Sequence, residues 1–304
     1  MLGVACASMP LVGTDHSANE LEGRVVLITG ATSGLGREVA LALAPLGSRL
    51  YLVGRDRGRS DATAARIARL APNADVRILI GDLSSRREVT RVAEEFLATG
   101  DPLHVLLNNV GGVGRLRREI SDDGIELTLA VNHFAPFVLT ALLLPRLRES
   151  APARIVNVAS DAYKDAKGRF DFDDYNAERR YHLLRQYGRS KLANILFTRE
   201  LARRLDGTLV TANAATPPRL TATRFAHNVH PLAKVALGVA RPFTMSPEKG
   251  ARAIVHLCRA PEVGTLNGTY WSGMTQPQLT DAATNADDAR RLWELSEALT
   301  GVGS

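Results

Sequence analysis

Cysteine is scarce in this sequence, whose 304 residues include only Cys6 and Cys258. Two cysteines cannot build the framework of several disulfides that stabilises small secreted proteins, and their separation matches no zinc-binding motif. The sequence therefore predicts no metal site and a protein that resides in a reducing compartment.

Long apolar runs are missing as well. A membrane-spanning helix needs about 20 consecutive, mostly apolar residues, and the best candidate, residues 131–144, is shorter and contains Asn132. Residues 1–13 are mildly apolar, but they lack the positively charged start of a signal peptide and are interrupted by Pro10. We expect a cytoplasmic protein without a membrane partner, in which residues 1–20 form a flexible segment.

The chain carries a formal net charge of +6, yet it has no pattern typical of nucleic-acid binding. Its arginines are scattered, and no motif combines them with aromatic residues. A solvated basic surface explains the charge, so we expect no nucleic-acid partner. With 45% hydrophobic and 23% charged residues the chain can bury a full core, and its length fits one large domain, residues 21–304.

Apolar, β-branched segments alternate along the chain with segments of helical periodicity. The predicted strands are residues 24–29, 49–53, 76–80, 103–107, 154–158, 208–213 and 268–271. The predicted helices are residues 34–46, 61–70, 86–98, 124–144, 187–205 and 246–258. Strands separated by helices of this length form parallel sheets with helices on both faces. The sequence therefore predicts an α/β fold, a doubly wound, Rossmann-type parallel sheet of about seven strands.

Two segments do not fit this alternation. Residues 161–186 are long, polar and poorly periodic, and residues 219–245 are mixed in character and contain Pro231 and Pro242. Insertions of this kind line a substrate pocket or form a lid, although plain surface loops have the same composition. We interpret both as substrate-loop insertions.

A glycine-rich turn joins the first predicted strand to the first predicted helix. Its glycines allow the backbone to turn sharply and to approach a diphosphate, whose charge is stabilised by the N-terminus of the helix. A tight turn without a ligand is the alternative, but the strand–turn–helix context favours a dinucleotide. The candidate binding residues in this turn are Gly30, Thr32, Ser33, Gly34, Leu35 and Gly36.

The residues just after the second predicted strand distinguish the two nicotinamide cofactors. An NAD site usually has a carboxylate there, which accepts hydrogen bonds from the ribose hydroxyls. This chain has Arg55, and Asp56 follows one position later. Because a guanidinium suits the doubly charged 2′-phosphate, the sequence predicts NADP(H) as the cofactor. An arginine that simply lies on the surface is the alternative.

Tyr187 and Lys191 lie four residues apart in a predicted helix, which places them on one face and one turn apart. A neighbouring ammonium favours the phenolate and so lowers the pKa of a tyrosine from its usual value of about 10. The pair taken alone is common and usually structural. Its combination with the glycine-rich turn and the strand order indicates an acid–base pair.

These motifs, in their combination and order, make residues 21–301 similar to the short-chain dehydrogenase/reductase family. The motifs that carry the resemblance are residues 29–36, Asp82-Leu83, residues 108–111 (Asn-Asn-Val-Gly), Asn132, Ser160, Tyr187 and Lys191. The chain is similar to the retinol-dehydrogenase-like subgroup in three features: residues 190–205, the long interval from Ser160 to Tyr187, and Tyr270-Trp271.

The resemblance implies a role for each matching residue. Tyr187 would exchange a proton with the carbonyl oxygen, and Ser160 would polarise that oxygen through a hydrogen bond. Lys191 would lower the pKa of Tyr187 and bind the nicotinamide ribose, and Asn132 would hold a water that links Lys191 to solvent. The other implied cofactor contacts are Asp82 and Leu83 on the adenine side, Asn109 along the adenosine ribose, and Leu220 and Thr223 near the nicotinamide.

The resemblance also bears on assembly. Relatives often pair through the helix that carries the tyrosine and lysine, although monomers are common in this subgroup. Ile195, Leu196 and Phe197 offer apolar surface on this predicted helix. We therefore expect a homodimer.

The chain departs from the family in the loop after the sixth predicted strand. The subgroup has His-Pro-Gly there, whereas this chain has Thr216-Pro217-Pro218-Arg219. The loop of this chain is one residue longer than that of the subgroup. Depending on the alignment, either Pro218 or Arg219 takes the place of the glycine, and both are stiffer than glycine. We expect the changed loop to reshape the substrate side of the nicotinamide site without abolishing cofactor binding.

Together these features predict an NADP(H)-dependent oxidoreductase that interconverts a carbonyl and an alcohol on a lipophilic small molecule. An epimerase or dehydratase on the same fold is one alternative, which the short glycine spacing and the lack of a nucleotide-sugar extension oppose. A non-catalytic NADP-sensing protein is another, although such proteins typically lose the tyrosine–lysine pair that this chain has. Turnover of any carbonyl compound separates the enzyme from the sensor.

Overall fold

Seven parallel strands form the sheet in the computed structural model, which describes residues 20–217 and 246–303. The strands are β1 (Val25–Thr29), β2 (Arg49–Gly54), β3 (Val76–Ile80), β4 (Val105–Asn108), β5 (Ala153–Val158), β6 (Val210–Thr216) and β7 (Tyr270–Ser272). Their order is β3-β2-β1-β4-β5-β6-β7, and every neighbouring pair runs in parallel. The predicted parallel sheet is confirmed.

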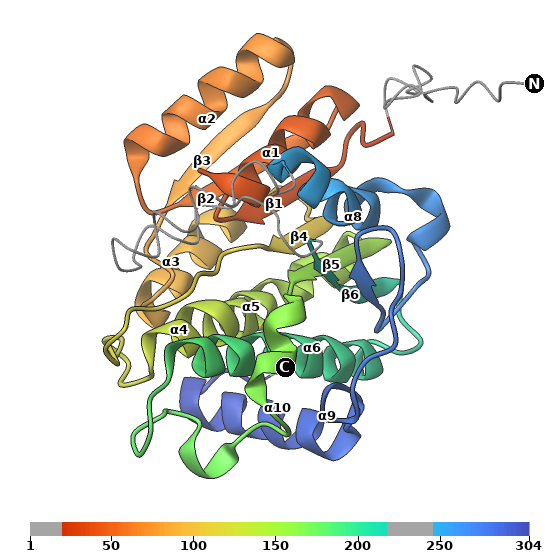
Figure 1. Ribbon diagram of the computed structural model, residues 1–304. Coiled ribbons are helices and arrows are strands. Elements are labelled where there is room, and N and C mark those ends of the chain that lie inside the picture. Colours follow the sequence, from red (N-terminus) through yellow and green to blue (C-terminus); the bar gives the residue numbers. More distant parts are fainter. Residues whose placement is uncertain (1–19, 218–245, 304) are drawn as a thin grey trace, which may run out of the picture.

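Helices cover both faces of the sheet (Figure 1). One face packs against α1 (Gly34–Leu43), α2 (Arg57–Leu70) and α8 (Pro247–Arg259), and the other against α3 (Arg86–Leu97), α5 (Ala135–Glu149) and α6 (Leu183–Arg204). The shorter elements and the last helix are η1 (Ala44–Leu46), α4 (Leu127–Leu129), η2 (Ala130–Phe134), η3 (Asp161–Ala166), η4 (Phe172–Asp174), η7 (Pro261–Val263), α9 (Asp281–Thr284) and α10 (Ala286–Thr300). Because successive strand residues point to opposite faces, apolar strands such as β1 contribute to two cores at once.

Two helices begin one turn before their predicted starts because a polar side chain caps each of them. Asp56 Oδ1 accepts a hydrogen bond from the Arg59 N–H at 2.8 Å at the start of α2. His182 Nδ1 accepts one from the Arg185 N–H at 3.4 Å at the start of α6. Such caps satisfy main-chain donors that the first turn of a helix leaves without a partner.

The C-terminal helix α10 is absent from the sequence prediction. Asn285 caps it by accepting a hydrogen bond from the Asp288 N–H at 2.8 Å. Its Trp293 packs against Phe137 of α5 and Phe197 of α6, with ring centroids 5.0 and 5.8 Å apart. A capping asparagine followed by apolar residues at helical spacing is the sequence signal that would have revealed this helix.

The apolar residues on which the expected homodimer depends are buried within the single chain. Ile195, Leu196 and Phe197 are at most 3% exposed, and Phe197 lies beneath Trp293 of α10. Apolar side chains that are already removed from water give no drive for association. These three residues therefore supply no dimer surface, and association through other residues stays a prediction.

Residues 161–186 are packed against two helices. Gly188 of α6 lies so close to η3 that a Cβ on it would be 2.7 Å from the Ala162 carbonyl oxygen. Arg169 forms a two-pronged ion pair with Asp288 of α10, whose side chain is buried. The expected insertion at 219–245 and the expected N-terminal segment, residues 1–20, lie outside the described residues except for Glu20.

Among the described residues one helical stretch, residues 127–149, is long and apolar enough to cross a membrane, and it extends beyond the run of residues 131–144. In its most apolar part 78% of the residues are buried inside the protein. Core helices of soluble proteins have the same length and composition, so the stretch is weak evidence for a membrane span. The expected lack of a membrane partner stays a prediction.

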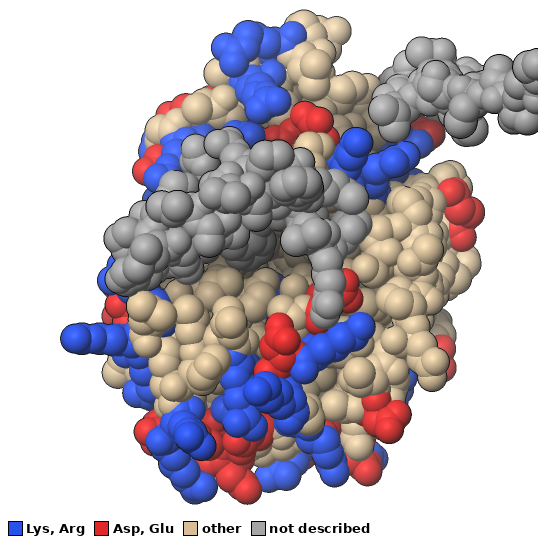
Figure 2. Space-filling model, in the orientation of Figure 1, with Lys and Arg blue, Asp and Glu red and all other residues tan. Residues whose placement is uncertain are grey.

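Acidic and basic side chains are interspersed on the face of the molecule shown in Figure 2. Surface ion pairs include Arg115 with Glu119 at 3.0 Å and Arg118 with Glu178 at 3.6 Å. Exposed pairs of this kind contribute little to stability. They neutralise individual arginines locally and leave the net charge of +6 unchanged.

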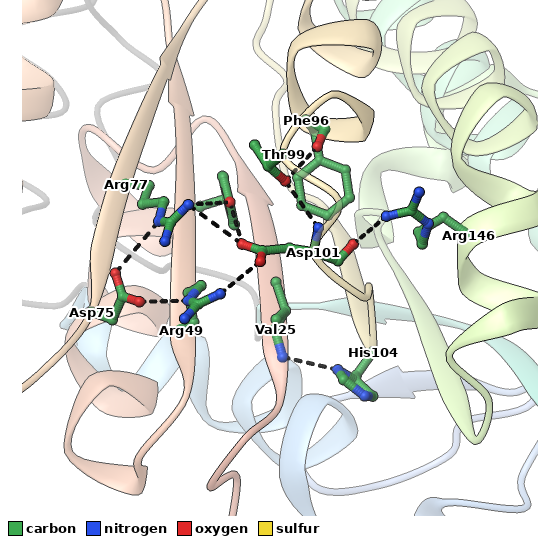
Figure 3. Close-up of polar contacts among 10 residues, drawn as sticks. Val25, Arg49, Asp75, Arg77, Phe96, Thr99, Asp101, His104 and Arg146 are labelled. Carbon is green, nitrogen blue, oxygen red and sulfur yellow. Dashed lines mark hydrogen bonds and ion pairs between the residues drawn. The ribbon is translucent and has the colours of Figure 1, made fainter.

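A charged network at the amino-terminal edge of the sheet joins β2, β3 and the loop before β4 (Figure 3). Asp101 accepts hydrogen bonds from the Tyr51 hydroxyl at 2.5 Å and from the Arg49 guanidinium at 2.7 Å, and Arg77 lies 3.6 Å away. Burial raises the pKa of the Asp101 carboxyl, but these hydrogen bonds and charges together lower it by more than burial raises it. The pKa of Asp101 therefore lies below its usual range. Ionised Asp101 therefore stabilises the fold.

Replacing Asp101 with asparagine should reduce the free energy of unfolding at pH 7 by about 1–3 kcal/mol, because two charge-assisted hydrogen bonds are weakened. Since the folded-state pKa of Asp101 is depressed, its contribution is present above the unfolded pKa of about 4 and is lost as the pH falls through the folded value. Urea unfolding at pH 7 and pH 3 should show the difference between wild type and Asp101→Asn shrinking at the lower pH. An equal difference at both pH values would contradict this account.

Candidate active site

The predicted site residues gather at the carboxyl edge of the sheet. The glycine-rich turn follows β1, Asn109 follows β4, and Ser160 follows β5. Strand order runs outward from β1 to β3 on one side and from β4 to β7 on the other, so the order reverses between β1 and β4. Parallel α/β sheets bind ligands in the crevice at such a reversal.

A threonine hydroxyl ties β1 to the end of β4. Thr29 Oγ1 donates a hydrogen bond to the Leu107 carbonyl at 3.2 Å. It accepts bonds from the N–H groups of Asn109 and Val110 at 2.9 and 3.0 Å. The Asn109 side-chain amide donates in turn to the carbonyls of Thr29 and Gly30 at 2.8 and 3.2 Å. These bonds occupy the amide nitrogen of Asn109. A ribose could therefore be contacted only by the other polar atoms of this residue.

Two glycines are required by the geometry of the turn. Gly30 has a φ of 66°, in the left-handed region that side chains other than hydrogen disfavour. At Gly36, in the first turn of α1, a Cβ would meet the amide nitrogen of Asn109 and would lie 2.5 Å from the Gly30 carbonyl oxygen. The first N–H groups of α1 can therefore approach the crevice only if residue 36 is glycine.

The other predicted residues of the cofactor site divide between crevice and core. Ser33 precedes α1, Gly34 begins it, and the methyl group of Thr32 packs against the end of β2. The side chains of Leu35 and of Leu83, after β3, are buried in the two cores. Both leucines can therefore offer a cofactor little more than their main-chain groups.

Arg55 and Asp82 lie side by side at the ends of β2 and β3. One Arg55 nitrogen is 4.0 Å from Asp82 Oδ2, and the Arg55 side chain is 73% exposed. The neighbouring carboxylate, Asp56, is used to cap α2. Both side chains at the end of β2 are exposed, and Asp56 is engaged in the cap, which leaves the Arg55 guanidinium as the charged group there without a capping role.

Tyr187, Lys191 and Ser160 converge beside this crevice. Lys191 Nζ lies 5.8 Å from the centroid of the Tyr187 ring and donates a hydrogen bond to the Val158 carbonyl at 3.0 Å. The Tyr187 hydroxyl is hydrogen-bonded to the side chain of Ser160. Ser160 Oγ also accepts a bond from the Ala162 N–H at 3.2 Å. The structure thus brings together three residues that are far apart in the sequence.

Burial dominates the electrostatics of Tyr187 and Lys191. It raises the pKa of Tyr187 to about 12, against the opposing hydrogen bond from Ser160, and it lowers the pKa of Lys191 to about 8. The family resemblance implies a lowered pKa for Tyr187, through the nearby ammonium. Here the ammonium is bound to the Val158 carbonyl, and the loss of water around the phenol is the larger effect. Tyr187 therefore carries its proton at neutral pH.

Asn132 lies in the π-helical turn η2, a feature frequent at functional sites. Its Oδ1 accepts a hydrogen bond from the Gly112 N–H at 2.9 Å, and its amide donates to the Gly112 carbonyl at 3.0 Å and to the Ser190 hydroxyl at 2.9 Å. A Cβ on Gly111 would be 3.1 Å from Asn132 Oδ1 and 3.2 Å from Lys191 Nζ. Asn132 and Lys191 therefore face the same stretch of backbone after β4.

A chain of buried polar residues behind the site is missing from the sequence prediction. The Asn108 amide donates to Asn157 Oδ1 at 2.8 Å, and the Asn157 amide donates to Thr198 Oγ1 at 2.9 Å. The Thr198 hydroxyl donates to the carbonyl oxygen of Asn194 at 2.7 Å. Asparagines inside otherwise apolar strands are the signal that could have revealed this chain, because a buried amide needs hydrogen-bond partners.

The altered loop after β6 is only partly described. Thr216 is buried, and its hydroxyl donates to the Pro217 carbonyl at 3.1 Å. Pro218 and the two predicted contacts Leu220 and Thr223 lie outside the described residues. The expected effect of this loop on the nicotinamide side stays a prediction.

Residues 20–217 and 246–303, the described part of the chain, include no group of three or more His, Cys, Asp or Glu side chains that could bind a metal ion. Cys258 is free and buried there, and burial raises its pKa to about 12. A thiol with so high a pKa is a poor nucleophile at neutral pH. The nucleophilic and metal-binding groups of this part of the chain thus suggest no second reactive centre.

Comparison with known proteins identifies the family. The family model described as short chain dehydrogenase matches residues 24–232, more than half of the chain. The chain belongs to the short-chain dehydrogenase family. Members of this family are oxidoreductases that use a nicotinamide cofactor.

Two curated relatives show that this short-chain dehydrogenase is retinol-dehydrogenase-like. It is 39% identical over 283 residues to retinol dehydrogenase 12 of Mus musculus, and 39% identical over 298 residues to retinol dehydrogenase 14 of Homo sapiens. Each alignment covers 93% of this chain and 88% of the relative.

Solved structures agree on the fold. A protein from Mycobacterium paratuberculosis superposes with a TM-score of 0.74 at 30% identity, over 94% of this chain and 96% of that one. The RhlG/NADP active-site complex of Pseudomonas aeruginosa superposes with a TM-score of 0.67 at 26% identity, over 84% and 97%.

Replacing Gly36 with alanine should weaken nicotinamide cofactor binding by about tenfold or more, roughly 1.4 kcal/mol, because the added Cβ pushes α1 away from the Gly30 turn. Fluorescence titration with NADPH measures the affinity. Gly58→Ala, in α2, is the matched control, since a Cβ there meets only an ordinary contact of 3.6 Å. Unchanged affinity in Gly36→Ala would mean that the turn does not hold the cofactor.

Proposed function

We propose that this short-chain dehydrogenase reduces the carbonyl group of a lipophilic small molecule with NADPH and catalyses the reverse oxidation with NADP⁺. The convergence of Tyr187, Ser160 and Lys191 beside the glycine-rich turn carries the proposal. Carbonyl reduction needs a proton donor and a hydrogen-bond donor at one oxygen. A protonated phenol and a hydroxyl that are already hydrogen-bonded to each other meet that need.

The residues present fit a nicotinamide dinucleotide. Gly30 and Gly36 let the N-terminus of α1 approach a diphosphate, and Arg55 and Asp82 are suited to the adenosine end. When bound, the cofactor supplies the hydride for the carbonyl carbon. Lys191 would hold the nicotinamide ribose.

In the proposed mechanism Tyr187 is the acid. Its raised pKa keeps the phenol protonated at neutral pH, so that it can donate its proton to the substrate oxygen during reduction. Ser160 would donate a hydrogen bond from its hydroxyl group to the same oxygen. The ammonium of Lys191 stabilises the phenolate that Tyr187 becomes, and Asn132 would hold a water through which the proton is replaced.

Two observations support NADP(H) over NAD(H). At the end of β2 the guanidinium of Arg55 is exposed and has no capping role, whereas Asp56 is engaged in capping α2. In addition, the similar RhlG structure is a complex with NADP. Because cells generally keep NADP reduced, we infer that the enzyme works mainly as a reductase.

A lipophilic substrate is supported by the relatives whose names give retinol, a long apolar alcohol, as the compound on which they act. The apolar residues expected near the pocket, such as Leu220 and Phe225, lie outside the described residues. We infer the chemical class, an apolar aldehyde or ketone. We also infer that residues 21–304 form one domain.

Tyr187→Phe should reduce kcat for carbonyl reduction by about a hundredfold or more while NADPH still binds, because the ring remains and only the proton donor is lost. The measurement is NADPH consumption with a panel of apolar aldehydes and ketones. Tyr51→Phe is the control, since it removes a hydroxyl that is bonded to Asp101 at the opposite edge of the sheet. A near-normal rate in Tyr187→Phe would assign the acid to another residue, and no turnover of any panel compound by wild type would reject the proposed activity.

Arg55→Ala should bring the affinities for NADPH and NADH closer together by about 10- to 100-fold, the range expected for one charge-assisted contact worth roughly 1.5–3 kcal/mol. Titration of both cofactors gives the ratio. Arg57→Ala is the control, because this equally exposed arginine pairs with Asp61 within α2. If Arg55→Ala and Arg57→Ala give the same ratio as wild type, Arg55 does not bind the 2′-phosphate.

A further inference from the structure

Helix α6 carries a second polar side chain on the same side as Lys191. Asn194 follows three positions later, which brings the two side chains together. The Asn194 amide donates a hydrogen bond to the Val158 carbonyl at 3.3 Å, and Lys191 Nζ donates to the same oxygen at 3.0 Å. Val158 is the last residue of β5 and lies two residues before Ser160. The last residue of β5 that pairs with β4 is the preceding one, Asn157.

Packing does not explain an asparagine at this position. Asn194 is 3% exposed, and its Oδ1 has no hydrogen-bond partner among the described residues. An unpaired polar atom in the interior destabilises a protein, whereas a leucine of similar size would avoid this cost. Leu192, Ala193 and Ile195 around it are fully buried apolar residues. What the asparagine has and a leucine would lack is the hydrogen bond from its amide to the Val158 carbonyl.

The Asn194 amide and the Lys191 ammonium share the Val158 carbonyl oxygen as a hydrogen-bond acceptor. Under the proposed function the three N–H groups of Lys191 are taken up by the two ribose hydroxyls and by the water that Asn132 would hold, so its ammonium gives up the bond to the Val158 oxygen. A buried carbonyl that loses its hydrogen-bond partner is unfavourable. Asn194 stays bonded to Val158 when Lys191 leaves, so this oxygen keeps a partner in both arrangements.

We propose that Asn194 is a positioning residue, which shares the Val158 carbonyl with Lys191 and so frees the ammonium to turn into the site. Asn194 contacts neither cofactor nor substrate in this role and acts only through Lys191. The inference rests on the proposed function, because it assigns Lys191 to the cofactor ribose.

The test is Asn194→Leu, which removes the amide and keeps the size of the side chain. Titration with NADPH alone should show affinity weaker by about tenfold, because Lys191 is now the only side chain bonded to the Val158 oxygen. With the best substrate of the aldehyde and ketone panel, kcat should fall by about tenfold and KM should change by less than about twofold. The melting temperature should equal or exceed that of wild type, since the unpaired oxygen is gone. A merely structural role predicts the reverse, a lower melting temperature with unchanged NADPH affinity.

Thr198→Val is the matched control. Thr198 lies one turn further along α6 and belongs to the same buried polar chain, but it bonds to Asn157 and to the Asn194 main chain, not to Val158. Its NADPH affinity and kcat should stay within about twofold of wild type. Asn194→Asp serves if the leucine variant does not fold: its carboxylate would hold the ammonium in an ion pair, and the same losses are expected.

The proposal is overturned if Asn194→Leu, or Asn194→Asp in its place, binds NADPH and turns over like wild type. It is also overturned if Thr198→Val reproduces the losses. If wild type binds NADPH but reduces no panel compound, the proposed function fails, and the NADPH affinities of the variants still decide the role of Asn194. If wild type does not bind NADPH, both proposals fail.

Discussion

The burial of α6 is the constraint on which the rest of the structure depends. Sixteen of its 22 residues are buried, including polar and charged ones that a solvent-exposed helix would leave in water. Each such residue needs a partner from another element, because burying it unpaired is unfavourable. Gln186 donates to the buried carboxylate of Glu126 at 3.1 Å, and Arg189 pairs with Asp171 of the insertion at 2.5 Å. The helix is therefore tied to its surroundings through polar contacts in fixed places.

These contacts also define the site. Ser190 binds Asn132 in the π-helical turn, and Lys191 and Asn194 bind the end of β5 just before Ser160. The groups that would act on a substrate are thus held by the same bonds that satisfy the buried polar residues of α6. Stability and site geometry have a common origin here, although three buried atoms of described α6 residues have no hydrogen-bond partner: Gln186 Oε1, Arg189 Nε and Asn194 Oδ1.

The burial of α6 is completed by parts of the chain that lie beyond the nucleotide-binding core. The insertion after Ser160 packs on it at Gly188, and α10 covers its Phe197. Arg169 and Asp288 then join the insertion to α10. A helix surface that could pair with a second copy is enclosed instead by the chain's own C-terminal helix, which makes the tyrosine–lysine helix a central element of a single subunit.

Much of the fold could be predicted from the sequence. The strands and most helices follow from local periodicity, because a strand buried on both faces is continuously apolar and a covered helix has one apolar side. The positions of Tyr187, Lys191, Ser160 and the glycine-rich turn also follow, since each motif is short and its spacing is set by a single element. The helix starts were misplaced where Asp56 and His182 act as caps, and α10 was missed.

The sequence by itself determined which groups are present: a glycine turn, a guanidinium after β2, and a phenol and an ammonium one helical turn apart. Only the tertiary structure decided how those groups behave. The direction in which the pKa of Tyr187 shifts, the carbonyl that Lys191 shares with Asn194 and the enclosure of Phe197 all depend on residues distant in sequence. The physical reason is that desolvation and hydrogen-bond pairing depend on the groups that surround a side chain in space. The spacing of residues along the sequence does not specify those groups.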